Sequence, residues 1–377
     1  MKIIIAPDSF KGSLRSPEVC RALASGFLRI FPDSEFILVP MADGGEGTVD
    51  AAVQAVGGEK VAVNVHGPLM EPVQAEYGVL SGDRAVFEMA SASGLELISD
   101  SLRNPLKTTT YGTGEILRAI LDREIHDITL GIGGSATVDG GAGMMQALGV
   151  KLLGRNGQEL PAGIGGGDLM EIAEIDISEL DARLAECSIR IACDVTNPLL
   201  GAFGAAAVFG PQKGASPKAV EVLENNLRHW FEILKSRGLC SDCSVPGDGA
   251  AGGLGFALRT LLKGRMASGA GLMIELTGLK NHLRGADLLV TGEGCSDSQT
   301  ADGKLCAVVA AAAGEAGVPA ILISGALRGD IAPLENVFAA VFSIARGPGS
   351  LEEAMRNTAA NLESAAANIG AVFKLGR

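Results

Sequence analysis

The sequence has 377 residues, a length that favours two domains over one. Its 44 acidic and 31 basic side chains give a formal net charge of −13, which argues against nucleic acid as a partner. Hydrophobic residues make up 47% of the chain and aromatic residues only 4%, which is typical of an α/β protein with aliphatic cores.

The N-terminal region alternates apolar segments with polar loops. Residues 3–6 predict a buried parallel strand, and residues 36–40 predict a second one. One helix should begin at Ser16, with Pro17 at its first helical position, and another should span residues 48–56. This order of strand, loop and helix is typical of a doubly wound sheet.

The middle of the chain predicts a more mixed structure. Short antiparallel strands are expected at residues 61–65, 74–80 and 85–89. Further strands are expected at residues 127–132 and 188–193, and helices at residues 114–123, 139–148 and 218–237. The last of these helices is expected at the surface and carries Trp230, the only tryptophan.

The C-terminal third repeats the order of the start. Strands are predicted at residues 286–290, 319–323 and 337–344, and helices at residues 305–316 and 350–373. Because the two ends share one pattern, we predict a discontinuous domain of residues 1–65 and 284–377. Residues 66–283 would form an inserted mixed α/β domain.

Cellular location is predicted from the cysteines and the apolar segments. Seven scattered cysteines indicate free thiols in a reducing compartment, and the lone pair Cys240 and Cys243 is expected in a polar loop. No apolar run reaches the ~18 residues of a membrane span, and the apolar start is too short for a signal peptide. We therefore expect a soluble cytoplasmic protein with no membrane partner.

A glycine-rich segment, residues 131–141, lies between a predicted strand and a predicted helix. Glycines let backbone N–H groups approach a phosphate, and a helix N-terminus adds partial positive charge. The spacing of Gly131, Gly133 and Ala136 loosely resembles a dinucleotide fingerprint, but the acidic residue expected about 20 residues later is absent. A packing turn is the alternative. The P-loop and the protein-kinase motifs are also absent.

Acidic loops follow several predicted strands and contain Asp43, Glu46, Asp194 and Glu293. A hard cation such as Mg²⁺ prefers one or two carboxylates together with waters and phosphate oxygens, so these loops suit a phosphorylated ligand with a metal. Helix N-capping is the alternative for any one loop. Lys11, in the loop after the first strand, could hold a phosphate or a substrate carboxylate as a point charge.

Taken together, the motifs resemble those of the bacterial glycerate kinases of the first type. The resemblance covers essentially the whole chain in order. It rests on IAPDSFKGS at residues 5–13, PMADGGEGT at 40–48, GIGGSAT at 131–137, CDVTNPLLG at 193–201, GAAAVFGPQKG at 204–214, and TGEG, DSQT and GK within 291–304.

The resemblance implies a flavodoxin-like doubly wound parallel sheet with an inserted restriction-endonuclease-like α/β domain. It also implies a kinase that uses ATP and Mg²⁺ to phosphorylate D-glycerate, at the 2-hydroxyl, in a cleft between the two domains. The product would be 2-phosphoglycerate. We expect a monomer or a homodimer.

The resemblance also implies the site residues, each named here by its expected role. Lys11 would neutralise the transferring phosphate or the glycerate carboxylate, and Asp194 or Asp8 would accept the hydroxyl proton. The expected catalytic residues are Asp8, Lys11, Asp43 and Asp194. Substrate binding is expected from Ser9, Lys11, Asp297 and Lys304. ATP binding is expected from Gly133, Gly134, Ser135, Thr137, Asn197 and Lys213. Magnesium is expected at Asp43, Glu46, Asp194 and Glu293.

Two positions depart from the family pattern. Cys295 and Ser296 stand where the family commonly has Arg followed by Ile or Leu, and Val138 stands where it commonly has Asn. Loss of an arginine removes a bidentate anion contact, which bears on the substrate and the rate. Two alternatives to the kinase stay open at this point: an NAD-linked oxidoreductase acting on a hydroxy acid, and a non-catalytic glycerate sensor.

Overall fold

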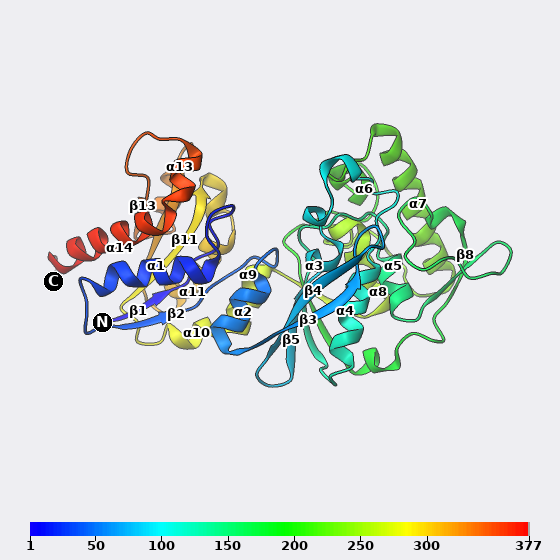
Figure 1. Cartoon of the computed structure of the whole chain (residues 1–377), viewed down its shortest axis with the longest axis horizontal. Coiled ribbons are helices and arrows are strands. Elements are labelled where there is room, and N and C mark those ends of the chain that lie inside the picture. Colours follow the sequence, from blue (N-terminus) through cyan, green and yellow to red (C-terminus); the bar gives the residue numbers. More distant parts are fainter. Residues whose placement is uncertain (376–377) are drawn as a thin grey trace. The chain divides into compact units, whose positions relative to one another are not determined.

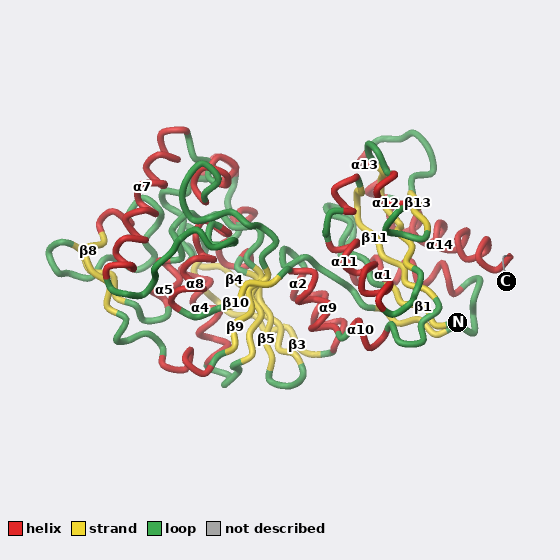
Figure 2. Tube along the Cα trace, turned by 180° about the vertical axis from the view of Figure 1, so that it is seen from behind, coloured by secondary structure: helices red, strands yellow, loops and turns green. Residues whose placement is uncertain are grey.

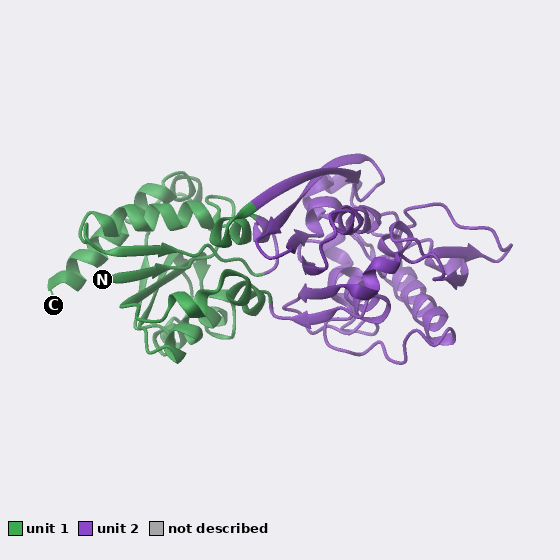
Figure 3. Cartoon of the chain, turned by 90° about the horizontal axis from the view of Figure 1, so that it is seen from below, with its two compact units in different colours: residues 1–43, 50–58, 269–377 green, residues 44–49, 59–268 purple. Residues whose placement is uncertain are grey.

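The structure is a computed structural model, and it describes residues 1–375. The chain forms two compact units, which Figure 3 colours separately. Unit 1 contains residues 1–43 and 50–58 and the chain from residue 269 onward, and unit 2 contains residues 44–49 and 59–268.

The boundaries between the two units differ from the expected ones, which lay after residues 65 and 283. The strand β3 (Gly58–His66) joins unit 2 because it lies next to β4 (Pro72–Leu80) in that unit's sheet. The helices α9 (Gly269–Thr277) and α10 (Leu279–His282) join unit 1, where α9 packs against α11 (Leu305–Glu315). Pairing and packing therefore place both segments differently from the sequence prediction.

Unit 1 is built on a five-stranded sheet in the order β13-β12-β11-β1-β2, in which every neighbouring pair is parallel. The strands are β1 (Lys2–Ile5), β2 (Glu35–Leu38), β11 (Leu288–Ser296), β12 (Ala320–Leu327) and β13 (Ala340–Ser343). The other helices of this unit include α2 (Thr48–Val56), which begins in unit 2, and α12 (Ala332–Glu335). Since the interior strand β1 is almost wholly apolar, it is buried between its two neighbours, β11 and β2.

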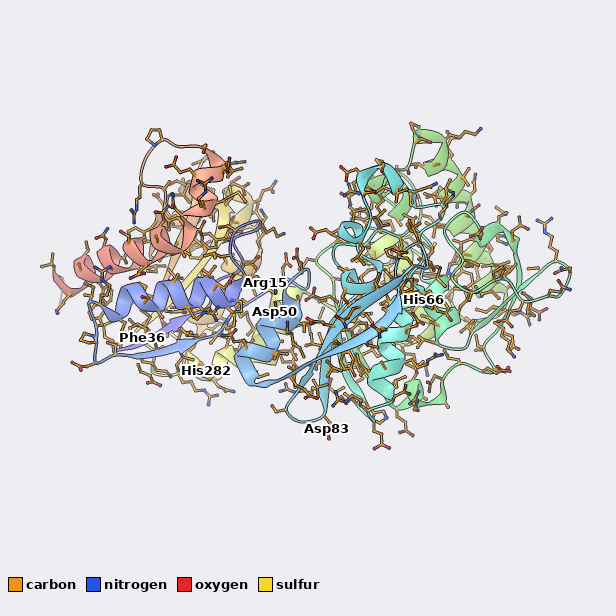
Figure 4. The ribbon with its side chains drawn as sticks, in the orientation of Figure 1. Arg15, Phe36, Asp50, His66, Asp83 and His282 are labelled. Carbon is orange, nitrogen blue, oxygen red and sulfur yellow. The ribbon has the colours of Figure 1, made fainter. Side chains whose placement is uncertain are left out.

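Two long helices pack side by side in unit 1. They are α1 (Ser16–Leu28) and α14 (Thr358–Leu375), drawn in blue and red in Figure 1. They approach closely because Gly26 has no side chain: a Cβ there would lie 2.2 Å from the carbonyl oxygen of Glu363. Arg15, just before α1, also forms an ion pair of 2.6 Å with Asp50 of α2 (Figure 4).

The single C-terminal helix predicted at residues 350–373 is wrong, because the chain forms α13 (Leu351–Arg356) and α14 with a break at Asn357. At this break the carbonyl oxygen of Met355 accepts hydrogen bonds from two side-chain hydroxyl groups. The Ser13 hydroxyl donates to that carbonyl at 2.7 Å, and the Thr358 hydroxyl donates to it at 2.9 Å. Such local bonds compete with the helical ladder and favour an interruption.

Unit 2 contains a six-stranded sheet in the order β10-β9-β6-β5-β4-β3. Figure 2 shows these strands in yellow, with the helices of the unit in red. Of the expected antiparallel strands, β5 pairs antiparallel with β4 but parallel with β6. The further elements are β5 (Arg84–Glu88), β6 (Asp127–Gly131), β9 (Ser188–Ala192), β10 (Arg265–Ala267), the hairpin β7 (Lys151–Gly154) with β8 (Ile172–Asp176), α3 (Ala90–Ser93), α4 (Tyr111–Leu121), α5 (Ala142–Ala147), α6 (Ala205–Phe209), α7 (Pro217–Ser236) and α8 (Leu254–Leu261).

The helix α7 has an exposed face, as expected of a surface helix, and Trp230 lies on its buried face. It is fully buried in the core of unit 2, and its indole N–H donates to the carbonyl oxygen of Gly140 at 3.1 Å. The indole fits because Gly140 has no side chain: a Cβ there would lie 2.6 Å from the indole ring. One face of α7 is therefore part of the core.

Both large sheets contain parallel strands combined with helices, so the α/β class is confirmed. Glu293, expected in a loop after a strand of residues 286–290, is instead part of β11, because pairing with β12 continues through Glu293 and Cys295. Among residues 1–375, no helix combines the length and the apolar composition that crossing a membrane requires.

Candidate active site

Four charged side chains of unit 1 gather around the carboxyl ends of β1 and β11. Asp8 follows β1, and its N–H donates to the carbonyl oxygen of Gly292 at 2.8 Å. The carboxylates of Asp43 and Glu293 and the ammonium group of Lys11 all act electrostatically on Asp8. Carboxyl ends of parallel strands are where doubly wound sheets bind ligands, so this cluster is a candidate active site.

The carboxyl group of Asp8 has a strongly altered proton affinity. Burial is the largest influence and, reinforced by Asp43 and Glu293, it raises the pKa of Asp8 to about 7. The Ser9 N–H, which donates to Asp8 Oδ1 at 2.6 Å, and the Lys11 ammonium group act in the opposite direction. A carboxylate that accepts a proton near neutral pH is suited to general base catalysis.

Glu293 is held in place by its own strand end. Its Oε1 accepts hydrogen bonds from the Ser296 hydroxyl at 2.8 Å and the Thr300 hydroxyl at 2.7 Å. Gly294 lies against the loop after β1, since a Cβ there would come within 3.4 Å of the Lys11 backbone nitrogen. The loop that carries Lys11 is therefore in contact with the strand β11, which carries Glu293.

Cys306 belongs to the same region and was not found by sequence analysis. It is buried on α11, and burial raises the pKa of its thiol, with smaller contributions in the same direction from Glu293 and Asp8. Its position in an Ala- and Val-rich helix gives no sequence signal of a site.

The two predicted substrate residues after β11 pair with each other. Lys304 and Asp297 form an ion pair of 3.6 Å, and Asp297 Oδ1 also accepts the Gln299 N–H at 3.0 Å. This pair is partly exposed, and it places a lysine and a carboxylate in the segment that follows Glu293.

In unit 2, the glycine-rich segment packs directly against the segment of residues 44–49. A Cβ at Gly131 would lie 2.2 Å from the Gly44 carbonyl oxygen, and one at Gly133 would lie 3.1 Å from Gly45 Cα. Glu88, a residue that sequence analysis missed, holds the same segment by accepting the N–H groups of Gly47 at 3.3 Å and Val49 at 2.8 Å.

We predict that Gly131→Ala weakens nucleotide binding and lowers the free energy of unfolding, because the new methyl group would collide with the Gly44 carbonyl. Overpacking of this kind costs about 1–3 kcal/mol. Urea unfolding and nucleotide titration of the variant check this. Gly314→Ala is the control: it adds a methyl group in open space on α11 and should leave the protein as stable or slightly more stable.

Three predicted nucleotide residues come together in the glycine-rich segment. The buried ammonium group of Lys213 donates to the Ser135 hydroxyl oxygen at 2.6 Å and to the Thr137 carbonyl oxygen at 2.7 Å. Burial lowers the pKa of Lys213 to about 7, while the nearby Asp139 acts in the opposite direction. Gly134, next to Ser135, has a φ of 72°, a conformation that favours glycine.

Asp139 organises the rest of this segment and was also missed by sequence analysis. The carboxylate is fully buried, and it accepts the Thr110 N–H at 2.8 Å, the Thr110 hydroxyl at 2.7 Å, and the N–H groups of Gly141 and Gly143. Burial raises the pKa of Asp139, and these four hydrogen bonds act against that change. Sequence analysis could not find this hydrogen-bonding role of Asp139, because Thr110 lies 29 residues away in the sequence.

The acidic loop after β9 lies at the same edge of the unit 2 sheet as the glycine-rich segment. The strands β6 and β9 are parallel neighbours with Gly131 opposite Ala192, so Asp194 follows β9 where Gly133 follows β6. Asp194 is exposed. The Asn197 side chain donates to the Phe203 carbonyl oxygen at 2.8 Å, which engages it within its own loop.

The predicted site residues are divided between the units. Unit 1 holds Asp8, Ser9, Lys11, Asp43, Glu293, Asp297 and Lys304. Unit 2 holds Glu46, Gly133, Gly134, Ser135, Thr137, Asp194, Asn197 and Lys213. Within residues 1–375, no group of three or more His, Cys, Asp or Glu side chains is arranged to hold a metal ion by itself. Magnesium in kinases keeps waters and phosphate oxygens as ligands, and the mutual repulsion of Asp8, Asp43 and Glu293 suits a nearby cation.

Comparison with known proteins establishes the family. The sequence model described as the glycerate kinase family matches residues 3–374. The chain belongs to the glycerate kinase family.

Curated and solved members of the glycerate kinase family are similar over their whole length. A glycerate kinase of Halalkalibacterium halodurans is 48% identical, covering 98% of this chain and 97% of its own. The glycerate 2-kinase of Escherichia coli K12 is 47% identical, covering 100% and 99%. A solved structure described as a glycerate kinase 2 of Salmonella typhimurium LT2 has a TM-score of 0.90 and 45% identity, covering 100% and 99%.

The two departures from the expected glycerate kinase pattern differ in their surroundings. Val138 is fully buried in the core of unit 2, so the change at this position concerns packing. Cys295 is exposed on β11, two residues after Glu293. The change at Cys295 is therefore at the surface, and the change at Val138 is in the core next to Thr137.

Proposed function

We propose that this member of the glycerate kinase family transfers the γ-phosphoryl group of ATP to the 2-hydroxyl of D-glycerate, giving 2-phosphoglycerate and ADP. The similarity to the glycerate 2-kinase of Escherichia coli supports the position of transfer. The observation that carries the proposal is the cluster of Asp8, Asp43, Lys11 and Glu293, in which a carboxyl group with a pKa near 7 lies beside a lysine.

Unit 1 would supply the acceptor chemistry. The glycerate hydroxyl oxygen forms a bond to the γ-phosphorus, the bond from that phosphorus to the β–γ bridging oxygen breaks, and ADP leaves. Asp8 accepts the hydroxyl proton as this happens. Lys11 neutralises the transferring phosphoryl group or the glycerate carboxylate, while Ser9, Asp297 and Lys304 position the substrate.

Unit 2 would bind the nucleotide phosphates. Gly133, Gly134, Ser135 and Thr137 form the loop that receives them, and Lys213 and Asn197 complete the set. Bound Mg²⁺ supplies neutralisation of the phosphate charge, with Asp43, Glu46, Asp194 and Glu293 as its proposed ligands. Asp194 is the alternative to Asp8 as the proton acceptor.

The finer description of the fold belongs to the same proposal. Numbered within unit 1 alone, the strand order β2-β1-β11-β12-β13 becomes 2-1-3-4-5, which supports a flavodoxin-like sheet. The restriction-endonuclease-like description of the inserted part, the cleft, the cytoplasmic location and the monomer or homodimer stay predictions. No observation favours the oxidoreductase or the sensor.

A coupled assay of the purified protein with D-glycerate, ATP and Mg²⁺ tests the activity, and NMR of the product identifies the phosphorylated hydroxyl. We expect ADP release that depends on D-glycerate, and 2-phosphoglycerate as the product. Lys11→Ala should lower kcat by about 10²-fold, because it removes a charge that stabilises the transition state. Asp194→Asn should also reduce turnover.

Lys218→Ala is the matched control, since Lys218 is exposed at the start of α7. Absence of glycerate-dependent ADP release would refute the substrate. The product 3-phosphoglycerate would refute the position of transfer. Wild-type turnover in both the Lys11 and the Asp194 variants would refute their roles.

A further inference from the structure

Lys213 is an unusual cation because it is buried without a partner of opposite charge. No carboxylate of residues 1–375 lies within ion-pair distance of its ammonium group. Its hydrogen bonds go instead to neutral oxygens, those of the Ser135 hydroxyl and the Thr137 carbonyl. An uncompensated ammonium group in a protein interior is costly, which is why such a site favours an arriving anion.

The surroundings fix Lys213 behind the glycine-rich segment. It ends a short 3₁₀ helix, and the following Gly214 has a φ of 94° and packs where a Cβ would lie 2.3 Å from the Arg103 carbonyl oxygen. The Ser135 hydroxyl oxygen accepts a hydrogen bond from the Lys213 ammonium group. The proton of this hydroxyl therefore points away from Lys213 and can be donated to a ligand. Lys213 thereby determines how Ser135 is presented.

The charged groups around Lys213 are few. Asp139 lies on the same loop two residues after Thr137 and favours the charged lysine, but its carboxylate is fully engaged by Thr110, Gly141 and Gly143. Arg103, on the neighbouring segment, is paired with Asp100 at 2.8 Å. Neither group neutralises the lysine directly.

We infer that Lys213 is the buried countercharge for a nucleotide phosphate held on the Gly133–Thr137 segment, and that it takes up a proton when that phosphate binds. It is a positioning residue, because it acts on the ligand through Ser135 and through its charge. This inference rests on the proposed function, and it adds a proton-linked step to nucleotide binding.

The direction of the pH dependence follows from the pKa of Lys213, about 7. At pH 6 the lysine is mostly charged before any ligand arrives, and at pH 8 it is mostly neutral. An anion nearby favours the charged form, so binding should take up a proton at pH 8 and almost none at pH 6. Affinity should fall as pH rises, approaching about tenfold weaker binding per pH unit above 7.

Isothermal titration calorimetry with a non-hydrolysable ATP analogue and Mg²⁺ tests this at pH 6 and pH 8. Two buffers with different ionisation enthalpies give the number of protons taken up. Wild type should show uptake at pH 8, where nucleotide phosphates are already ionised. Lys213→Met should bind about 10- to 100-fold more weakly and lose the uptake. Lys213→Arg stays charged at both pH values, so its affinity should lose the part of the pH dependence that Lys213 causes.

Lys218→Met is the control, and it should bind and take up protons as the wild type does, since Lys218 is exposed. Thermal unfolding shows whether the Lys213 variants fold. If Lys213→Met does not fold, Lys213→Arg decides, because an arginine is already charged at pH 8 and should bind the analogue without the uptake. No uptake by an active wild type at pH 8, or unchanged uptake in Lys213→Met, overturns the inference.

Two further outcomes separate the inference from the proposed function. A wild type that neither binds the analogue nor releases ADP with glycerate refutes the proposed function itself. The product phosphate shares the same chemistry, so titration with 2-phosphoglycerate alone separates the two sources. If proton uptake requires Lys213 but occurs with 2-phosphoglycerate and not with the ATP analogue, Lys213 is not the countercharge of a nucleotide phosphate.

Discussion

Asp8→Asn should lower kcat by about 10²–10⁴-fold, because the amide keeps the shape of the side chain but cannot accept the proton of the substrate hydroxyl. The N–H of residue 8 still donates to Gly292, so the loop after β1 should keep its conformation. Steady-state kinetics with D-glycerate measures the loss, and nucleotide titration should show affinity within a few-fold of the wild type.

Asp33→Asn is the matched control in unit 1, since Asp33 is exposed in the loop before β2. It should have wild-type kcat. If Asp8→Asn retains full kcat while Asp194→Asn loses it, the proton acceptor is Asp194, the alternative that sequence analysis left open.

Trp230→Ala should lower the free energy of unfolding by about 3–5 kcal/mol, which is the usual cost of removing a large aromatic side chain from a core. The indole is fully buried, and its N–H bond to the Gly140 carbonyl oxygen would also be lost. Urea unfolding followed by far-UV circular dichroism measures the change without relying on tryptophan fluorescence.

Phe203→Ala is the aromatic control in the same unit. Phe203 is 75% exposed, so its removal should change the free energy of unfolding by less than about 0.5 kcal/mol. Equal losses in the two variants would contradict the buried position of Trp230. Since Gly140 belongs to the glycine-rich segment, Trp230→Ala should also weaken nucleotide binding.

Elements with strong local signals were predicted well from sequence. The helix expected at residues 48–56 has those bounds, and the strands at residues 3–6 and 127–132 are each within one residue of β1 and β6. The break at Asn357 was missed, because it depends on Ser13 reaching Met355 across the fold. The contact between Trp230 and Gly140 was not predicted for a similar reason, since the two residues lie far apart in the sequence.

The candidate site was predicted in part. Carboxylates in loops after strands indicated Asp43 and Glu293, because a metal ligand requires that residue type, whereas Asp8 and Ser135 were indicated as site residues by the family resemblance. The residues that position these loops by hydrogen bonds could not be predicted from the sequence. Glu88 and Asp139 act on backbone N–H groups far away in sequence, and such contacts leave no local pattern.

The position of β1 between β11 and β2 has a consequence for synthesis on the ribosome. Residues 2–5 leave the exit tunnel long before one of their two neighbouring strands, β11, which begins at Leu288. The bond from Ser13 to Met355 is formed later still. The nascent strand β1 and the loop that carries Asp8 therefore stay incompletely paired until the whole of unit 2 has been translated.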